Sequence, residues 1–240
     1  MKIISSGKKP TIAIVCCQHG DEIFGLEVFK YFARHLSSYP AVKLILANEE
    51  AVARKTRFID EDLNRVFNMS KGEAHERRLA RQILPEIAKS TYVLDIHTTT
   101  SDLRMTPIIT TLNAKIRKIL RLCPFPEVAY MQPPLGNHAL IGQVTAGVSL
   151  EFNEKYAKTP EALEMVIKIV DDLQKKSFSH SQKRKVYFID RAIPLEIKIK
   201  KEYRNFQYIP EQKIFPFLLR EKSYTTIQGF AAKVVKEMEV

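Results

Sequence analysis

Short apolar runs alternate with stretches of helical periodicity along most of this chain. Continuous runs rich in β-branched residues are typical of strands buried in a parallel sheet. Such strands are predicted at residues 11–17, 42–47, 92–96, 105–110 and 148–152. Apolar residues that recur three or four positions apart predict helices, here at residues 23–36, 73–88, 113–122 and 159–176. The alternation predicts an α/β fold with a doubly wound, mixed sheet flanked by helices.

Two of the predicted helices carry start signals. Asn113 precedes one of them, and asparagine caps helix N-termini well. Thr159 is placed as an N-cap before Pro160, which suits a first helical position. Residues 124–142 are rich in proline and are predicted to be irregular.

The pattern changes after residue 176. Residues 177–185 are polar and basic and are predicted to be a linker. Short alternating segments follow, and they predict antiparallel strands at residues 186–189, 195–199, 206–209 and 215–219. We therefore predict a main domain over residues 1–178 and a small β-rich C-terminal lobe over residues 179–240.

Composition narrows the class of protein. The 240 residues are 45% hydrophobic and 27% charged, as in a soluble globular protein, and no run approaches the roughly 18 apolar residues of a membrane helix. Three cysteines make no disulfide framework, and the basic N-terminus lacks a signal-peptide core, so a cytoplasmic location is expected. The net charge of +11 is spread along the chain without a nucleic-acid-binding motif, so neither nucleic acid nor membrane is expected as a partner. A homo-oligomer is left open.

Residues 56–65 form the densest polar segment, TRFIDEDLNR. Arginines, acids and an asparagine are interleaved there with apolar residues, a pattern that suits a segment anchored on one side and facing a site on the other. Arg57 and Arg65 favour an anionic ligand, because guanidinium groups hold carboxylates through paired hydrogen bonds. A helix start with local salt bridges is the simpler alternative.

Histidines and acids follow two of the predicted strands. His19 and Glu22 lie where the strand at 11–17 gives way to a helix, and His97 follows the strand at 92–96. Open α/β sheets place their sites at such strand ends. Two nitrogens and a carboxylate match the three protein ligands of a catalytic zinc ion, which leaves a fourth position to water. Taken singly, the HxxE pattern is more often a surface feature and His97 more often a core histidine.

Two acids lie inside apolar strands. Asp95 and Glu151 are predicted to be buried, and a buried carboxylate is costly unless it is paired or bound to a metal. Either residue can belong to a catalytic site or to a structural pair with an arginine.

The segments HGDE (19–22), RFIDEDLNR (57–65), DIHTTTS (95–101) and SLEF (149–152) occur in that order. In this order the chain resembles the aspartoacylase and succinylglutamate desuccinylase family of zinc-carboxypeptidase-like hydrolases. A weaker fifth match is FLLREKSY (217–224), within a small β lobe that the family also has. The resemblance implies a zinc-carboxypeptidase-like fold and one Zn²⁺ per chain, bound by His19, Glu22 and His97. It implies further that Asp62 hydrogen-bonds a zinc-binding histidine and that Glu151 is the general base and then the general acid.

The resemblance also implies a substrate site. Arg57 would polarise the scissile amide carbonyl, and Asn64 with Arg65 would bind a substrate carboxylate. Tyr224, with Glu221 nearby, would close the pocket from the C-terminal lobe. The implied activity is hydrolysis of a small N-acyl amino acid or a related carboxylate-bearing acyl amide.

The chain departs from the family at one position. The aspartoacylase branch has a carboxylate-binding arginine ten residues before the general base, where this chain has Ile141. N-acetylaspartate is therefore expected to be a poor substrate, and the desuccinylase branch is supported no better. Two alternatives stay open: a zinc carboxypeptidase that acts on peptides, and a non-catalytic ligand-binding relative. Retention of Glu151 argues against the second of these.

Overall fold

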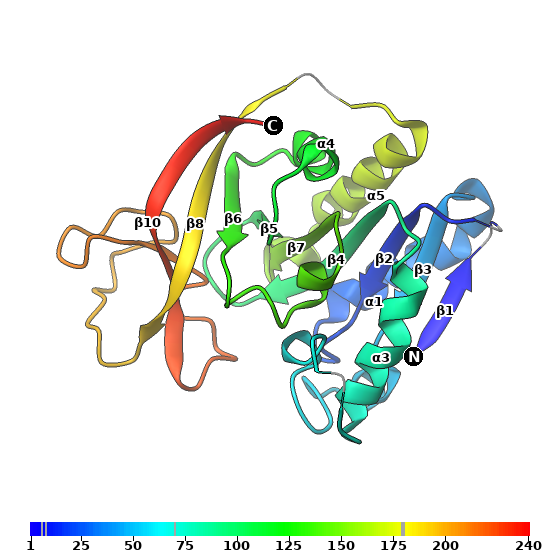
Figure 1. Ribbon diagram of the computed structural model, residues 1–240, viewed down its shortest axis with the longest axis horizontal. Coiled ribbons are helices and arrows are strands. Elements are labelled where there is room, and N and C mark those ends of the chain that lie inside the picture. Colours follow the sequence, from blue (N-terminus) through cyan, green and yellow to red (C-terminus); the bar gives the residue numbers. More distant parts are fainter. Residues whose placement is uncertain (6, 8, 70, 179–180) are drawn as a thin grey trace.

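The computed structural model describes residues 1–5, 7, 9–69, 71–178 and 181–240. Over these residues the chain forms one ten-stranded mixed sheet with helices on both faces (Figure 1). The strands are β1 (Lys2–Ser5), β2 (Ile12–Cys16), β3 (Val42–Leu46), β4 (Tyr92–Thr99), β5 (Met105–Ile109), β6 (Glu127–Met131), β7 (Gly147–Asn153), β8 (Lys183–Pro194), β9 (Phe215–Phe217) and β10 (Ile227–Glu239). The α-helices are α1 (Ile23–Arg34), α2 (Glu49–Arg54), α3 (His75–Ile87), α4 (Ala114–Leu122) and α5 (Pro160–Lys175). Short 3₁₀ turns lie at Leu36–Ser38, Leu63–Arg65, Leu140–Gln143 and Tyr156–Lys158.

The strand order is β1-β3-β2-β4-β7-β5-β6-β8-β10-β9. Strands β3, β2, β4 and β7 are parallel to one another and form the centre of the first half of the sheet. The remaining strands pair in both directions, and β5 runs antiparallel to β7. The carboxyl ends of β2, β4 and β7 therefore meet at one edge of the sheet.

Alternate residues of the buried strands supply the two faces of the core. In β2, Ile12 and Ile14 pack on the face covered by α1, α4 and α5, whereas Ala13 and Val15 pack on the face covered by α3. Every residue of β2 is buried, as a strand covered on both faces requires. The packing confirms the doubly wound arrangement that the sequence predicts.

Helix starts follow the sequence signals in part. The Asn113 side chain accepts hydrogen bonds from the backbone of the first turn of α4, as predicted. Helix α5 begins at Pro160, but the hydroxyl of Thr159 donates to the Tyr156 carbonyl at 2.8 Å and makes no cap. Thr159 thus ends the preceding 3₁₀ turn and occupies the N-cap position by backbone geometry alone.

Several predicted elements are corrected. Strand β6 lies inside the proline-rich segment predicted to be irregular, and residues 183–185 of the predicted linker belong to β8. Residues 195–199 and 206–209 are not strands, apart from a single bridge at Ile209. Strands β1 and β10 are not predicted at all, yet β10 forms the longest pairing in the molecule's C-terminal part, with β8.

The C-terminal strands extend the main sheet. Strand β6 pairs in parallel with β8, so one sheet contains strands from both sides of the predicted domain boundary. The division into two units stays a prediction. Within the described residues, no helix has the length and apolar character needed to cross a bilayer.

Candidate active site

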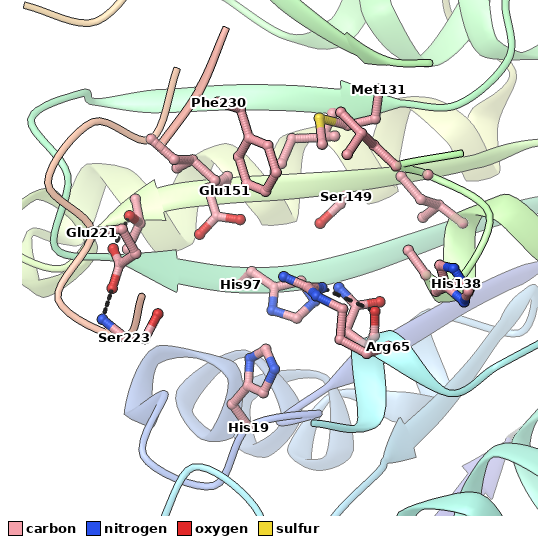
Figure 2. Close-up of a pocket in the computed structure, with 18 of the residues that line it drawn as sticks. His19, Arg65, His97, Met131, His138, Ser149, Glu151, Glu221, Ser223 and Phe230 are labelled. Atoms are coloured by element: carbon pink, nitrogen blue, oxygen red, sulfur yellow. Dashed lines mark hydrogen bonds between the residues drawn. The ribbon is translucent and has the colours of Figure 1, made fainter. Parts of the chain in front are cut away.

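A cavity of about 310 Å³ opens at the carboxyl ends of β2, β4 and β7. His19 follows β2, whereas His97 and Glu151 are register partners on the adjacent strands β4 and β7. Figure 2 shows His97 between His19 and Glu151, with His138 at one end of the view and Glu221 at the other. The strand ends thus bring together residues that are far apart in sequence.

His19, Glu22 and His97 form a buried cluster that is suited to a metal ion. One ligand atom from each lies within 4.8 Å of the others. The Nδ1 atom of His19 is 2.6 Å from Oε1 of Glu22, and Nδ1 of His97 is 3.1 Å from Oε2 of the same carboxylate. Both imidazoles therefore direct Nδ1 to the same carboxylate, one to each oxygen. Two nitrogens and one carboxylate that converge in this way fit the donor set of a catalytic zinc site.

The outer nitrogen of each imidazole is held by a second carboxylate. Nε2 of His19 is 2.9 Å from Asp62, as the sequence predicts for Asp62, and Nε2 of His97 is 3.0 Å from Asp95. A carboxylate on the outer nitrogen fixes the tautomer and the orientation of a metal-binding histidine. Asp95, marked in the sequence only as a buried acid, thus takes the same role for His97 that Asp62 takes for His19.

The charges of this cluster shift the pKa values of its members. Burial opposes protonation of His97, but Asp95 and Glu22 outweigh it and raise its pKa well above the ordinary value. Burial acts to raise the pKa of Glu22, but His19 and His97 outweigh it and lower the pKa. A cation that binds here competes with protons on the imidazoles, so its binding releases protons.

The loop at residues 57–65 forms the adjoining wall. The Arg57 guanidinium lies 3.6 Å from Glu22 and 3.4 Å from Asp62, which directs it to the cluster. Asn64 accepts a hydrogen bond from the Leu140 backbone at 3.1 Å through Oδ1, so its amide N–H groups remain to donate. Arg65 is exposed at the cavity, and no ion pair links it to a carboxylate among the described residues. Asn64 and Arg65 thus present N–H donors at the cavity.

A glycine at position 20 allows the neighbouring backbone to pack closely beside the cluster of His19, Glu22 and His97. The backbone N–H of this glycine donates to the Arg57 carbonyl at 3.1 Å. A Cβ atom at this position would lie 2.1 Å from the carbonyl carbon of Ala51. Only glycine permits so close an approach, which accounts for the glycine of the HGDE segment.

The side chain of Glu76 holds the backbone of the same loop, a contact that the sequence does not predict. This buried side chain accepts backbone N–H groups from Ile59 at 2.7 Å, Asp60 at 3.0 Å and Glu61 at 3.2 Å, and the Asn48 amide at 3.0 Å. Burial acts to raise its pKa, but these donors outweigh burial and lower it. The carboxylate thus fixes the backbone between the two arginines of the loop.

Glu76→Gln is expected to lower kcat/KM by about tenfold to a hundredfold, because small displacements of positioning groups carry losses of that order. The glutamine amide accepts only through its oxygen. Some of the N–H groups that now donate to Glu76 would therefore lose their acceptor and face the N–H groups of the new side chain. Kinetics on any substrate of the protein would measure the loss. Glu73→Gln is the matched control, since Glu73 has an 88% exposed side chain just before α3. Equal activity in both variants would show that Glu76 does not position the loop.

Glu151 lies across the cavity from the cluster. Burial raises its pKa to about 7, with the imidazole of His97 acting against the shift and Glu22 adding to it. A carboxyl group whose pKa is near neutrality can both accept and return a proton. The position and environment of Glu151 therefore match those of a general base.

Residues of the C-terminal part close the cavity. Tyr224 lines it, packs edge-on against Phe230, and has its pKa raised by burial. Glu221 accepts hydrogen bonds from the Thr99 hydroxyl and from the backbone and hydroxyl of Thr100, at 2.7 and 3.0 Å. Glu221 therefore fastens the segment that carries Tyr224 to the end of β4, a contact that the sequence does not predict.

The far wall is apolar. Ile141, at 3% exposure, lines the cavity. Further apolar lining residues are Ile108, Met131, Leu135, Phe217, Leu218 and Phe230. Among the described residues, the lysine and arginine side chains that line this cavity are Arg57 and Arg65. Among the described residues of the C-terminal strands, no lysine or arginine lines the cavity to replace the arginine that the aspartoacylase branch has at the position of Ile141.

Comparison with models of known protein families identifies the family of this chain. The model of the succinylglutamate desuccinylase/aspartoacylase catalytic domain matches residues 8–173, well over half of the chain. The chain belongs to this family. The match covers all the candidate site residues except those after β8, and it confirms the resemblance that the sequence motifs carry.

Individual relatives fall into several branches of the family. An N-acyl-aromatic-L-amino acid amidohydrolase (carboxylate-forming) of Xenopus tropicalis is 31% identical over 119 residues, which is 43% of this chain and 38% of that protein. Aspartoacylase of Mus musculus is 34% identical over 115 residues, 41% of this chain and 37% of that protein. These alignments therefore span well under half of the length of the curated relatives.

Solved structures of family members share the whole fold. Murine aminoacylase 3 superposes with a TM-score of 0.73 at 16% identity, covering 97% of this chain and 96% of that one. The succinylglutamate desuccinylase of Chromobacterium violaceum gives 0.72 at 14% identity, covering 98% and 86%. These neighbours confirm the zinc-carboxypeptidase-like fold, including the C-terminal strands.

Proposed function

We propose that this protein is a zinc-dependent amidohydrolase that removes the acyl group from a small N-acyl amino acid. The observation that carries the proposal is one cavity in which His19, Glu22 and His97 converge and face Glu151. The membership of the chain in an amidohydrolase family supports it. The roles of the individual residues belong to the proposal.

The donor set would hold one Zn²⁺ per chain through the Nδ1 atoms of His19 and His97 and the carboxylate of Glu22. Bound zinc would supply a Lewis acid and lower the pKa of a water ligand to about 7. Asp62 and Asp95 would keep the two imidazoles oriented through their Nε2 atoms.

The remaining groups provide the acid–base and electrostatic chemistry. Glu151 takes a proton from the attacking water and passes it to the leaving nitrogen. Arg57 stabilises negative charge on the carbonyl oxygen, because its guanidinium already points to the cluster. Asn64 and Arg65 bind the carboxylate of the substrate, and Tyr224 closes the cavity over it.

The lining of the cavity supports a proposal about the amino acid part of the substrate. With Arg57 directed to the cluster, Arg65 is the guanidinium placed for a substrate carboxylate, and the opposite wall is apolar around Ile141. A second carboxylate would find no lysine or arginine on that wall among the described residues. We therefore propose substrates with one carboxylate and an uncharged, apolar side chain.

N-acetylaspartate is expected to have a kcat/KM about tenfold to a hundredfold below that of N-acetyl derivatives of leucine or phenylalanine. A missing charged hydrogen bond is worth roughly 1.5–3 kcal/mol, which corresponds to that range. The measurement is a direct comparison of kcat/KM on zinc-loaded protein, following release of free amine. A clear preference for N-acetylaspartate would refute the role assigned to Ile141.

The same assay tests the function itself. A panel of N-acyl amino acids that varies the acyl group and the side chain is offered to zinc-loaded protein. Turnover of at least one member is expected. Binding without turnover of any member would favour a ligand-binding relative instead.

A further inference from the structure

Gln18 is a buried amide directly before the first metal-ligand candidate. Its side chain is 0% exposed. Its Nε2 atom lies 2.7 Å from both carboxylate oxygens of Asp95 and 3.4 Å from Nε2 of His97. The amide therefore faces the one carboxylate that orients His97.

Gln18, Asp95 and His97 form a continuous chain of contacts to the metal cluster. Oδ2 of Asp95 is shared between Gln18 and His97, whereas Gln18 is the hydrogen-bond partner found for Oδ1 among the described side chains. The contacts of Gln18 with both oxygens, together with the His97 contact to Oδ2, restrain the plane of the carboxylate. That plane in turn sets the direction in which Oδ2 meets the His97 ring, and so the direction of Nδ1 on the far side of the ring.

The orientation of the amide is dictated by charge. Nε2 must face Asp95, because the reversed amide would place its oxygen against a carboxylate. As a result Oε1 of Gln18 is buried without a hydrogen-bond partner among the described residues. Buried polar atoms without partners are uncommon and call for a reason. The contact with Asp95 is that reason here.

We propose that Gln18 is a positioning residue for the metal site, acting on His97 through Asp95. The proposal rests on the proposed zinc site and deepens it. Gln18 touches none of the reacting groups, so its effect is on how firmly the site holds zinc. It also links strands β2 and β4 behind the cluster, because Gln18 follows β2 while Asp95 and His97 belong to β4.

Gln18→Met keeps the length of the side chain and removes the donor. We expect the dissociation constant for zinc to rise about tenfold to a hundredfold, as for other residues that orient metal ligands. Competition with a chromophoric chelator measures it without any substrate. The absorption spectrum of the Co²⁺-loaded variant should change as well, because the His97 ligand is less well aimed.

A double-mutant cycle shows whether Gln18 acts through Asp95. Asp95→Asn alone should weaken zinc binding at least as much, and adding Gln18→Met should weaken it no further. Gln174→Met is the matched control. Gln174 lies on the remote helix α5 and bonds the backbone of Ser38 and Ala41, so this substitution should leave zinc affinity unchanged. Thermal unfolding of the metal-free proteins confirms folding, and Gln18→Ala replaces Gln18→Met if the latter does not fold.

The possible results distinguish a failure of the proposed zinc site from a failure of the role proposed for Gln18. Wild-type protein that binds no zinc would overturn the metal site itself. Zinc-binding wild-type protein with an affinity within about twofold of the Gln18 variant would overturn the role of Gln18 alone. Fully additive losses in the double mutant would show that Gln18 acts by another route.

Discussion

Glu151→Gln is expected to keep the fold and the zinc and to lose about 100- to 10,000-fold in kcat. The amide is nearly isosteric with the carboxylate but cannot accept a proton from the attacking water. Glu151 is 8% exposed and faces the cluster across the cavity, and burial raises its pKa to about 7. The measurement is kcat on the best N-acyl amino acid, together with zinc content.

Two controls show whether the loss of activity comes from the missing carboxylate of Glu151. Glu164→Gln makes the same chemical change at an exposed position of α5 and should retain full activity. Equal zinc content and equal thermal unfolding in Glu151→Gln would show that the site is otherwise intact. A loss smaller than about tenfold would reject Glu151 as the general base.

Replacement of a metal ligand is expected to have the other large effect. Wild-type protein should carry about one zinc per chain, whereas His19→Ala and His97→Ala should carry little, because a catalytic zinc site depends on three protein ligands. Turnover should fall with the metal. Elemental analysis after removal of loosely bound metal measures the stoichiometry.

His35→Ala is the control for these variants. His35 follows α1, and its side chain contacts the carbonyl of Tyr31 at 2.8 Å and the ring of the same residue. Its loss therefore removes a histidine without touching the cluster. Chelation of the wild-type protein should lower its unfolding temperature, though by less than it would for a zinc finger, since a large core remains. Full zinc in both ligand variants would refute the assigned ligand set.

The convergence of His19, Glu22 and His97 could be predicted from sequence because these residues lie at or near the ends of continuous apolar runs. Such runs identify buried parallel strands, and the residues after them fall at one sheet edge. His19 follows β2 as expected, whereas His97 lies inside β4, two residues before its end, and not after the strand as predicted. Asp62 reaches His19 as the family motif implies. The register of β4 against β7 then brings Glu151 beside His97.

The C-terminal part was harder to predict because alternation alone does not make a strand. Residues 195–199 alternate between apolar and polar, yet Leu195 and Ile197 are 55% and 39% exposed, and the segment forms no ladder with any strand among the described residues. Strand β6 was hidden by the prolines around it, although Glu127–Met131 itself contains none. Pairing partners, which the local pattern does not contain, decided both cases.

Glu76 and Gln18 escaped prediction for a different reason. An acid in the first turn of an amphipathic helix is usually a surface residue that suits the helix dipole. Glu76 is instead buried because the backbone of residues 59–61 folds over it. Gln18 gains its meaning only from Asp95, 77 positions away in sequence. Residues that support a site depend on tertiary contacts, whereas the residues that form it carry motifs.

Titration of metal-free protein with zinc, while release of free amine from an N-acyl amino acid is followed, tests the central claim most directly. The account predicts no turnover before zinc is added, a linear rise, and saturation at about one equivalent per chain. Full turnover in the metal-free protein would contradict the account, and so would the absence of turnover on every member of the substrate panel at saturating zinc.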